Sequence, residues 1–386
     1  MNPVNGSNEN ASSSLHKKWK VDKRFESGSV ASPISAKDYL RPCYFTDWSV
    51  YREGDFKFAP EDYLPGLCTH IVFGFGWINF HSFAAAPMNP SDLGDNGTYA
   101  RVNKLKQSDP GLKTILSFGG AYFPVEVFRR LASGRHNRQK FIGSAVEWVE
   151  KHGFDGIAID WKFPEAEDKT NFVSLVKELK EAVKKARKEQ LLVSVSLSAD
   201  ISVSEAGYDL AELGKQVDFA LLLAYNFHGT WNQTGLNAPL CAKKGDPKSV
   251  EFSAFHVAKS GFPRKKIIIG VDAQGRGWTL ADPSKREVGA PASGRTKSRG
   301  AYYEICHLLK QGAKRHWDDL SKTPYLVKGN QWFSYDDEQS IGAKIDFVIE
   351  HGFGGAFTWS LDFDDFKGKC NGKKYPLLSV IAKKLK

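Results

Sequence analysis

Eight short apolar runs that alternate with helical patterns, with one long insertion before the last run, predict an α/β chain folded as a (β/α)8 TIM barrel. Most runs are apolar throughout, as expected for parallel strands that helices cover on the outside. The runs are Pro42–Trp48, His70–Gly76, Thr114–Phe118, Gly156–Asp160, Leu192–Ser198, Phe219–Tyr225, Ile267–Val271 and Gly355–Trp359. The helical patterns between them include Arg138–Lys151, Lys169–Glu189, Val250–Ser260 and Ser340–His351.

The spacing of these runs divides the chain into four predicted segments. Residues 1–39 are polar and without periodicity, so we expect them to be disordered, and they lack the apolar stretch of a secretory leader. Residues 40–273 hold barrel strands one to seven, and residues 339–386 hold strand eight and a C-terminal helix. Residues 274–338 are too many for a loop and predict a small α+β insertion domain between strands seven and eight. Such an insertion would form one wall of a cleft, because the loops that follow barrel strands surround the active site.

Composition excludes several functional classes. The net charge of +10 is spread over helices without a basic arm or nucleic-acid motif, which argues against nucleic acid and leaves a mild attraction to acidic glycans or a cell-surface receptor. No apolar run is long enough to span a membrane. No metal or cofactor motif is present. We expect a monomer.

The cysteines and the glycosylation motifs indicate an oxidising compartment. Five cysteines, none in a CxxC pair, fit two disulfides and one free thiol. Asn-x-Ser/Thr motifs at Asn96 and Asn232 are glycosylation candidates, and two more lie at Asn5 and Asn10. We therefore expect a secreted, extracellular glycoprotein.

The fourth run places two opposite charges at the mouth of the barrel. Side chains of a strand alternate between its faces, so Asp160 and Lys162 share the face of Ala158, while Ile157 and Ile159 face the helices. A carboxylate in an apolar barrel interior is costly unless it is paired. Lys162 is the obvious partner, and the simplest interpretation is an ion pair that only keeps the barrel mouth ordered.

The motifs of these runs, in order, resemble those of glycoside hydrolase family 18, the chitinases, over about residues 41–384. The segment 154–164 is similar to the family's Asp-x-x-Asp-x-Asp-x-Glu signature, with Asp155 and Asp160 matching and Ala158 and Lys162 departing from it. Further resemblances lie at Cys43–Arg52, Ser117–Gly120, Tyr225–Gly229, Gly275–Leu280 and Gly354–Phe366. Asn226 stands where the family's strand-six motif has Asp.

The resemblance implies a substrate-assisted mechanism whose acid is missing here. In the family, the substrate's acetamido oxygen attacks the anomeric carbon, an Asp stabilises the intermediate, a Tyr holds the acetamido group, and a Glu protonates the leaving oxygen. Tyr225 matches the Tyr, but Lys162 replaces the Glu, and an ordinary lysine has a pKa of about 10.4, far above the range of about 6 to 7 that suits a catalytic acid. With no intact catalytic set, we expect a protein that is not an enzyme: a chitinase-like lectin that binds chitin or N-acetylglucosamine oligosaccharides.

The resemblance also implies the binding residues and the disulfides. Trp359 matches the family tryptophan beneath the sugar, whereas the strand-three tryptophan is replaced by Ala121. The predicted pairs are Cys43 with Cys68 and Cys306 with Cys370, which leaves Cys241 free. The predicted ligand-binding residues are Tyr44, Trp48, Phe75, Asp160, Lys162, Tyr225, Arg276 and Trp359.

Two alternatives remain open at this point. One is an active family 18 chitinase with a displaced acid, which would cleave β-1,4 N-acetylglucosamine polymers. The other is a growth-factor-like secreted signalling protein with an empty cleft. We expect hydrolysis assays and titration with chitin oligosaccharides to distinguish these two alternatives from the chitinase-like lectin.

Overall fold

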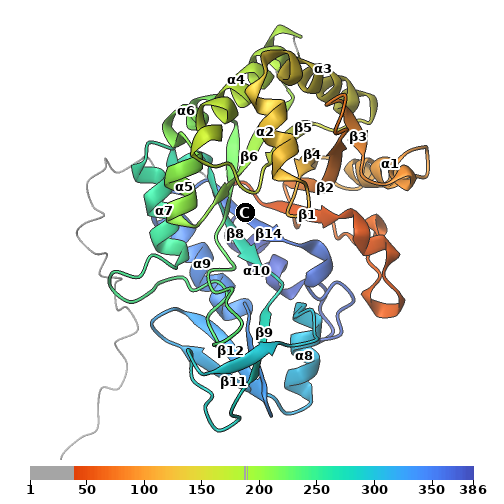
Figure 1. The fold of residues 1–386 in the computed structure, drawn as a ribbon. Coiled ribbons are helices and arrows are strands. Elements are labelled where there is room, and N and C mark those ends of the chain that lie inside the picture. Colours follow the sequence, from red (N-terminus) through yellow and green to blue (C-terminus); the bar gives the residue numbers. More distant parts are fainter. Residues whose placement is uncertain (1–38, 187, 189) are drawn as a thin grey trace, which may run out of the picture. The chain divides into compact units, whose positions relative to one another are not determined.

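The computed structural model describes residues 39–186, 188 and 190–386, and these form a closed parallel barrel with a second, smaller sheet (Figure 1). The order around the barrel is β1-β14-β8-β7-β6-β5-β4-β2, and β1 pairs with β2 to close it. Every pairing in this ring is parallel, so the predicted (β/α)8 barrel is confirmed. The strands are β1 Pro42–Thr46, β2 His70–Ile78, β4 Lys113–Gly119, β5 Gly156–Asp160, β6 Leu192–Ser198, β7 Phe219–Leu223, β8 Ile267–Asp272 and β14 Gly355–Trp359. A short strand, β3 (Ala85–Pro87), pairs with β2 outside the ring.

Helices follow the barrel strands because most strands are apolar on both faces and must be covered on the outer side. Figure 1 shows α2 to α6, in yellow to green, on the outside of β4 to β6. The bounds are α1 Thr98–Lys104, α2 Val125–Ser133, α3 Arg135–Lys151, α4 Lys169–Lys185, α5 Ile201–Gly207, α6 Leu210–Gln216, α7 Val250–Lys259, α9 Glu338–Glu350 and α10 Pro376–Lys384. No helix in the described part of the chain is both long and apolar enough to cross a membrane.

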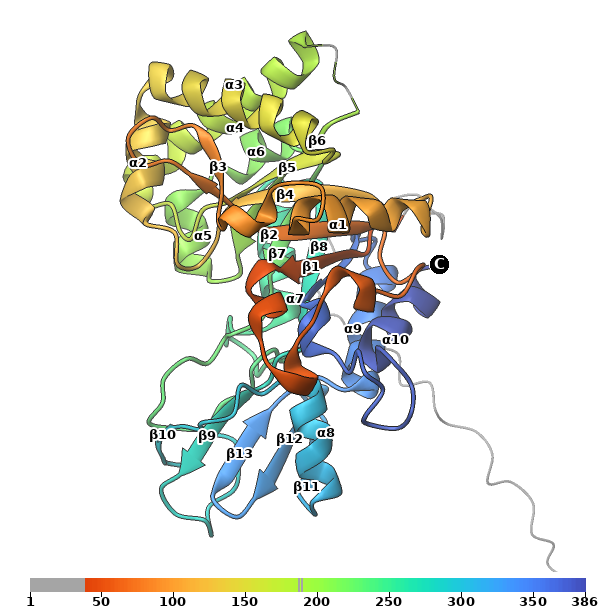
Figure 2. The ribbon, with the colours of Figure 1, turned by 90° about the vertical axis from the view of Figure 1, so that its right-hand side faces the viewer.

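The chain between β8 and β14 builds an antiparallel sheet of order β10-β9-β13-β12-β11 together with helix α8 (Figure 2). The elements are β9 Arg276–Leu280, β10 Ala292–Arg295, α8 Tyr302–Lys310, β11 Lys314–Asp318, β12 Thr323–Lys328 and β13 Gln331–Ser334. Its core contains Trp278 and Trp332, both fully buried. Because β9 begins four residues after β8 ends, this sheet stands beside the barrel mouth.

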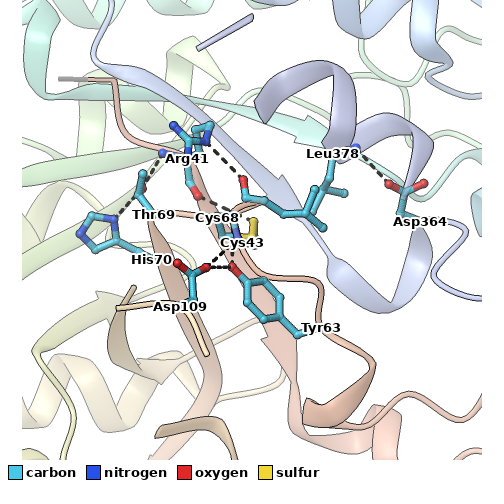
Figure 3. Close-up of a disulfide and its surroundings, with 11 residues drawn as sticks. Arg41, Cys43, Tyr63, Cys68, Thr69, His70, Asp109, Asp364 and Leu378 are labelled. Atoms are coloured by element: carbon cyan, nitrogen blue, oxygen red, sulfur yellow. Dashed lines mark hydrogen bonds between the residues drawn. A yellow bond between two sulfur atoms is a disulfide. The ribbon is translucent and has the colours of Figure 1, made fainter. Parts of the chain in front are cut away.

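Two disulfides tie connections to the barrel. Cys43 in β1 bonds to Cys68, just before β2, and the nearby Tyr63 hydroxyl donates to Asp109 at 2.8 Å (Figure 3). Cys306 in α8 bonds to Cys370, between β14 and α10. Burial raises the pKa of the free Cys241 thiol to about 12, so the group is a neutral thiol at physiological pH.

The predicted disorder and the sequons at Asn5 and Asn10 lie outside the described residues. Asn96 and Asn232 are both exposed, as a glycosylated side chain must be.

Candidate sugar-binding cleft

The carboxyl ends of the barrel strands bring most of the predicted site residues to one mouth, as the parallel topology requires. Tyr44 and Phe75 lie within their strands, and the others lie at a strand end or in the first residues after it. They are Tyr44 and Trp48 (β1), Phe75 (β2), Asp160 and Lys162 (β5), Tyr225 and Asn226 (β7), Arg276 (after β8, in β9) and Trp359 (β14).

Asp160 and Lys162 form the ion pair that the two-residue spacing predicts. Lys162 Nζ lies 3.3 Å from Asp160 Oδ2, and the side chains are 16% and 0% exposed. The ammonium group also lies 5.7 Å from the centroid of the Trp359 ring, so its charge stands above the aromatic base of the cleft. Burial raises the pKa of the neighbouring Tyr44 well above its ordinary value, and the Asp160 carboxylate raises it further.

The acidic residues that follow this strand point elsewhere. Glu165 and Glu167 pair with Arg129 of α2, at 3.0 Å and 2.8 Å, and their side chains are 70% and 64% exposed. Neither therefore takes the place of the missing carboxylic acid beside Asp160.

Aromatic rings form the base of the cleft. The Trp359 ring centroid lies 5.1 Å from that of Tyr44, 6.2 Å from Trp48 and 6.4 Å from Phe75. Tyr44 and Phe75 are buried in the barrel core, whereas Trp48 and Trp359 are partly exposed. Tyr44 and Phe75 thus support the base from below, and Trp48 and Trp359 keep part of their ring surfaces accessible.

Two hollows open at this mouth. One, of about 740 Å³, is lined by Ala121, Lys162, Ser198, Tyr225 and Asn226, among others. The other, of about 710 Å³, is lined by residues that follow β1 and by Arg299 from the inserted segment. Trp48 lines this second hollow. Each hollow has both aromatic and polar residues in its wall, a lining that suits an oligosaccharide.

Tyr225 and Asn226 lie just beyond β7, where the chain leaves the barrel. Gly270 leaves the space for Tyr225, because a Cβ at residue 270 would lie 2.9 Å from the tyrosine ring. Arg276 Nε donates to Asn226 Oδ1 at 2.6 Å, and its guanidinium lies 5.5 Å from the centroid of Trp231. Trp231 was not among the predicted site residues.

The two remaining signature positions differ in their placement. Asp155 precedes β5 and lies at the opposite end of the strand, where it accepts from Thr114 N at 2.7 Å and pairs with Lys106 at 2.6 Å. Ala158 is fully buried below Asp160, and its register partners are Ser117 of β4 and Ser194 of β6. The cleft therefore contains Asp160 and Lys162 but not Asp155.

A buried carboxyl group, Asp272, also belongs to this mouth and was missed from the sequence. It ends β8 in register with Trp359, and it accepts from Asn237 Nδ2 at 3.0 Å and from Gln274 N at 2.8 Å. Burial raises its pKa to about 7. Burial also raises the pKa of Tyr225, and the charge of Asp272 raises it further. The sequence feature that could have identified Asp272 is its position as a polar residue at the end of an apolar barrel strand.

The raised pKa of Asp272 predicts a loss of stability with rising pH. The folded carboxyl keeps its proton to about pH 7, whereas the unfolded chain releases it near pH 4. Between these values the folded state binds more protons, so stability falls as pH rises through this window. We expect Tm to decrease from pH 5 to pH 8 and the decrease to be smaller in Asp272→Asn, as followed by calorimetry. Asp282→Asn, at a partly exposed residue of the inserted segment, is the control, and equal decreases in both variants would contradict the assignment.

Comparison with known proteins identifies the family. The model of glycosyl hydrolases family 18 matches residues 41–364. A probable endochitinase of Caenorhabditis elegans is 46% identical over 387 aligned residues, which cover 94% of this chain and 63% of the relative. The chain thus spans less than two thirds of that relative's length.

Solved structures agree with this assignment. An immunomodulatory active chitinase from Trichuris suis is 43% identical, with a TM-score of 0.86 over 90% of this chain and 100% of that one. Human YKL-39, described as a pseudo-chitinase with retained chitooligosaccharide binding properties, is 36% identical, with a TM-score of 0.84 over 90% of this chain and 99% of that one.

These relatives correct one expectation. The prediction that the chain is not an enzyme is wrong, because curated relatives named endochitinases align with most of it. That prediction rested on the changed signature positions, above all Lys162, and Asp160, Tyr225 and Trp359 still lie at the mouth. The chain belongs to family 18 of the glycosyl hydrolases, as a chitinase-like member with a (β/α)8 barrel.

Proposed function

We propose that this chain binds β-1,4-linked N-acetylglucosamine oligosaccharides in the cleft at the mouth of its barrel. The observation that carries the proposal is the partly exposed Trp359, which Tyr44, Trp48 and Phe75 surround at the base of the cleft. A pyranose ring presents an apolar face of C–H groups that packs on an indole, and its rim of hydroxyls needs polar partners. Tyr225, on the wall, offers a phenol to such a rim.

The relatives support the same ligand class. Human YKL-39 has been solved in the presence of chitooligosaccharides, at 37% identity to this chain. A binding protein and an enzyme both need such an aromatic base, because an enzyme must also bind the sugar before it can hydrolyse it.

Hydrolysis of the same oligosaccharides is the second candidate function, and the endochitinase relatives favour it. Asp160 remains to stabilise the intermediate, and Tyr225 remains to hold the acetamido group. A carboxylic acid donates a proton far more readily than a lysine ammonium, whose ordinary pKa is about 10.4. Turnover by this chain therefore needs a proton donor other than Lys162. The candidate is Asp272, a buried carboxyl group with a pKa of about 7 on the Tyr225 side of the mouth.

Titration with chitotetraose tests the binding proposal. We expect heat release and a change in tryptophan fluorescence in the wild-type chain, and a loss of affinity of at least about tenfold, or 1.4 kcal/mol, in Trp359→Ala. Trp317→Ala is the matched control, because Trp317 lies in β11 at the far edge of the inserted sheet. Absence of heat and of any fluorescence change would refute the proposal and favour a signalling protein with an empty cleft.

A fluorogenic chitobioside assay tests the second candidate. If the wild-type chain releases the fluorophore and Asp160→Asn does not, the hydrolysis takes place in this cleft. Release that survives this substitution would come from elsewhere and would contradict it.

A further inference from the structure

Two buried carboxyl groups lie in the segments that flank one side of the cleft. Asp47 is the first residue of η3 (Asp47–Tyr51), the short 3-10 helix that follows β1, and it directly precedes Trp48. Asp92 is the last residue of η6 (Pro90–Asp92), in the connection between β3 and α1. The two residues are 1% and 0% exposed. Among the described residues, no cation pairs with either carboxyl group.

Asn89 joins the two carboxyl groups. Its side-chain Nδ2 donates to Asp47 Oδ2 at 2.5 Å, and its backbone N–H donates to Asp92 Oδ2 at 3.1 Å. The second oxygen of each carboxyl group has no hydrogen-bond partner in the described part of the chain. Because a buried carboxylate needs donors or a counter-ion, this arrangement suits a pair in which at least one carboxyl group is neutral.

The ionisation of the pair falls close to neutral pH. Burial raises the pKa of Asp92 to about 6, and burial together with the charge of Asp92 raises the pKa of Asp47 to about 7. The titratable group that faces both is Tyr99 of α1, which burial keeps as a neutral phenol by raising its pKa. The His152 ring lies 5.5 Å from that of Tyr99, and burial lowers its pKa, so it is also neutral at pH 7.

The cations of the neighbouring elements are engaged with other groups. Arg52, directly after η3, pairs with Asp362 at 2.6 Å. Arg101 of α1 pairs with Glu61, and the charge of Lys104 acts on the same carboxylate. Lys151 of α3 lies over the Trp148 ring, 5.9 Å from its centroid. A second negative charge on the buried pair is therefore not neutralised by these groups.

The segment that begins with Asp47 also carries a ring of the cleft. Trp48, its second residue, is one of the two partly exposed rings at the base of the cleft. Tyr51, its last residue, shares a hydrogen bond between hydroxyl groups with Ser91 of η6. The segment is thus linked to the β3–α1 connection at both of its ends, and a repulsion between the two carboxyl groups would act directly on the backbone of Trp48.

We propose that Asp47 and Asp92 are positioning residues, which hold Trp48 in place for sugar binding while the pair keeps a proton and release it when both are ionised. The inference rests on the proposed function and adds a pH dependence to the same cleft. Two carboxylates in one buried space repel each other, so their ionisation lowers the fraction of molecules in which Trp48 is in place. The apparent affinity for the sugar falls by that fraction. Since the proton is present at low pH and lost as pH rises through about 7, binding is tighter in acid.

Titration with chitotetraose at several pH values tests the inference. We expect the affinity of the wild-type chain to fall about tenfold between about pH 5.5 and about pH 8. In Asp47→Asn and in Asp92→Asn, which keep the shape of the side chain but cannot ionise, the fall should be less than about twofold. Linkage requires that such binding also takes up protons, so calorimetry in two buffers of different ionisation enthalpy should show an uptake of about half a proton near pH 7 in the wild type alone.

Two further variants locate the effect. Trp48→Ala should weaken binding and remove its pH dependence, because no indole remains to be displaced. Asp272→Asn should keep the tenfold fall, although Asp272 also lies at the mouth and has a pKa of about 7. A fall that persists in Trp48→Ala, or one that disappears in Asp272→Asn and persists in Asp47→Asn, overturns the inference.

The free chain provides a test that needs no sugar. Its tryptophan fluorescence should change between about pH 5.5 and about pH 8, and this change should be smaller in Trp48→Phe and in Asp92→Asn. If chitotetraose binds at no pH, the proposed function is refuted, and the fluorescence alone decides whether the pair positions Trp48. Equal fluorescence changes in the wild type and both variants overturn the inference, and equal affinities at the two pH values overturn it while the proposed function stands.

Discussion

The triple variant Ala158→Asp, Lys162→Glu, Asn226→Asp is expected to hydrolyse a fluorogenic chitobioside at least about a hundredfold faster than the wild-type chain. A positioned general acid contributes about 10² to 10⁴ in rate, and the variant places a carboxylic acid where the signature has one. The change also removes an ammonium group that stands 5.7 Å from the centre of the Trp359 ring, near the position where positive charge develops on the sugar.

The barrel is prepared for the new carboxylate at residue 158. Ala158 pairs in register with Ser117 on one side and Ser194 on the other. Both hydroxyls are buried, and that of Ser194 has no hydrogen-bond partner among the described residues. An Asp at this position therefore finds hydroxyl donors close by, which lowers the cost of burying it.

Single substitutions separate the contributions. Lys162→Glu alone should gain less than the triple variant, because its new carboxyl group would stand beside an Asp160 that has no Asp at residue 158 with which to share a proton. Adding Asp160→Asn to the triple variant is the control and should abolish the gain. A triple variant that folds, binds chitotetraose and cleaves no faster than the wild type would show that the acid position does not limit the rate.

The fold was predictable because its strands are short and regularly spaced, and most of them are apolar on both faces. The bounds of β5, β6 and β14 agree with the apolar runs to the residue. The run that ends at Tyr225 was too long, because β7 stops at Leu223 and Asn226 then adopts a positive φ of 63° that turns the chain into the loop. The short helices α5 and α6 were not predicted, because seven residues contain too few turns to show a helical period.

The site was predictable where it depends on one strand and not where it depends on several. The Asp160–Lys162 pair follows from the alternation of side chains along β5. The burial of Tyr44 and Phe75, the position of Asp272 beside Trp359, and the serines beside Ala158 depend on the register between strands, which a single sequence does not contain. Asp155 belongs to the signature but binds Thr114 at the other end of its strand, so the signature also contains structural residues.

Lys344→Met is expected to destabilise the chain by about 3 to 5 kcal/mol, the largest stability effect that we predict for one substitution. Lys344 in α9 and Asp336, just after β13, are 0% and 1% exposed, and Lys344 Nζ lies 2.6 Å and 2.7 Å from the two carboxylate oxygens. The pair joins the end of the inserted sheet to the last helix before β14. Removal of the ammonium leaves a carboxylate in a site where water cannot replace the lost partner.

The pH dependence of this loss follows from the remaining acid. Burial raises the pKa of Asp336 above its ordinary value even with Lys344 present, and the loss of Lys344 should raise the pKa of Asp336 further. The orphaned carboxyl can therefore take up a proton at low pH, so the destabilisation should be smaller at pH 5 than at pH 8.

Urea denaturation of three variants distinguishes a buried charge from an ordinary ion pair. The double variant Asp336→Leu, Lys344→Met should recover most of the stability, because an apolar pair replaces a buried ion pair at little cost. Lys384→Met is the matched control, since it breaks the pair of Lys384 in α10 with Asp346 in α9, whose side chains are 35% and 58% exposed. It should cost less than about 1 kcal/mol. If Lys344→Met were no less stable than Lys384→Met, the buried pair would contribute no more than a surface pair, and the connection between the inserted sheet and the barrel would have to depend on apolar packing alone.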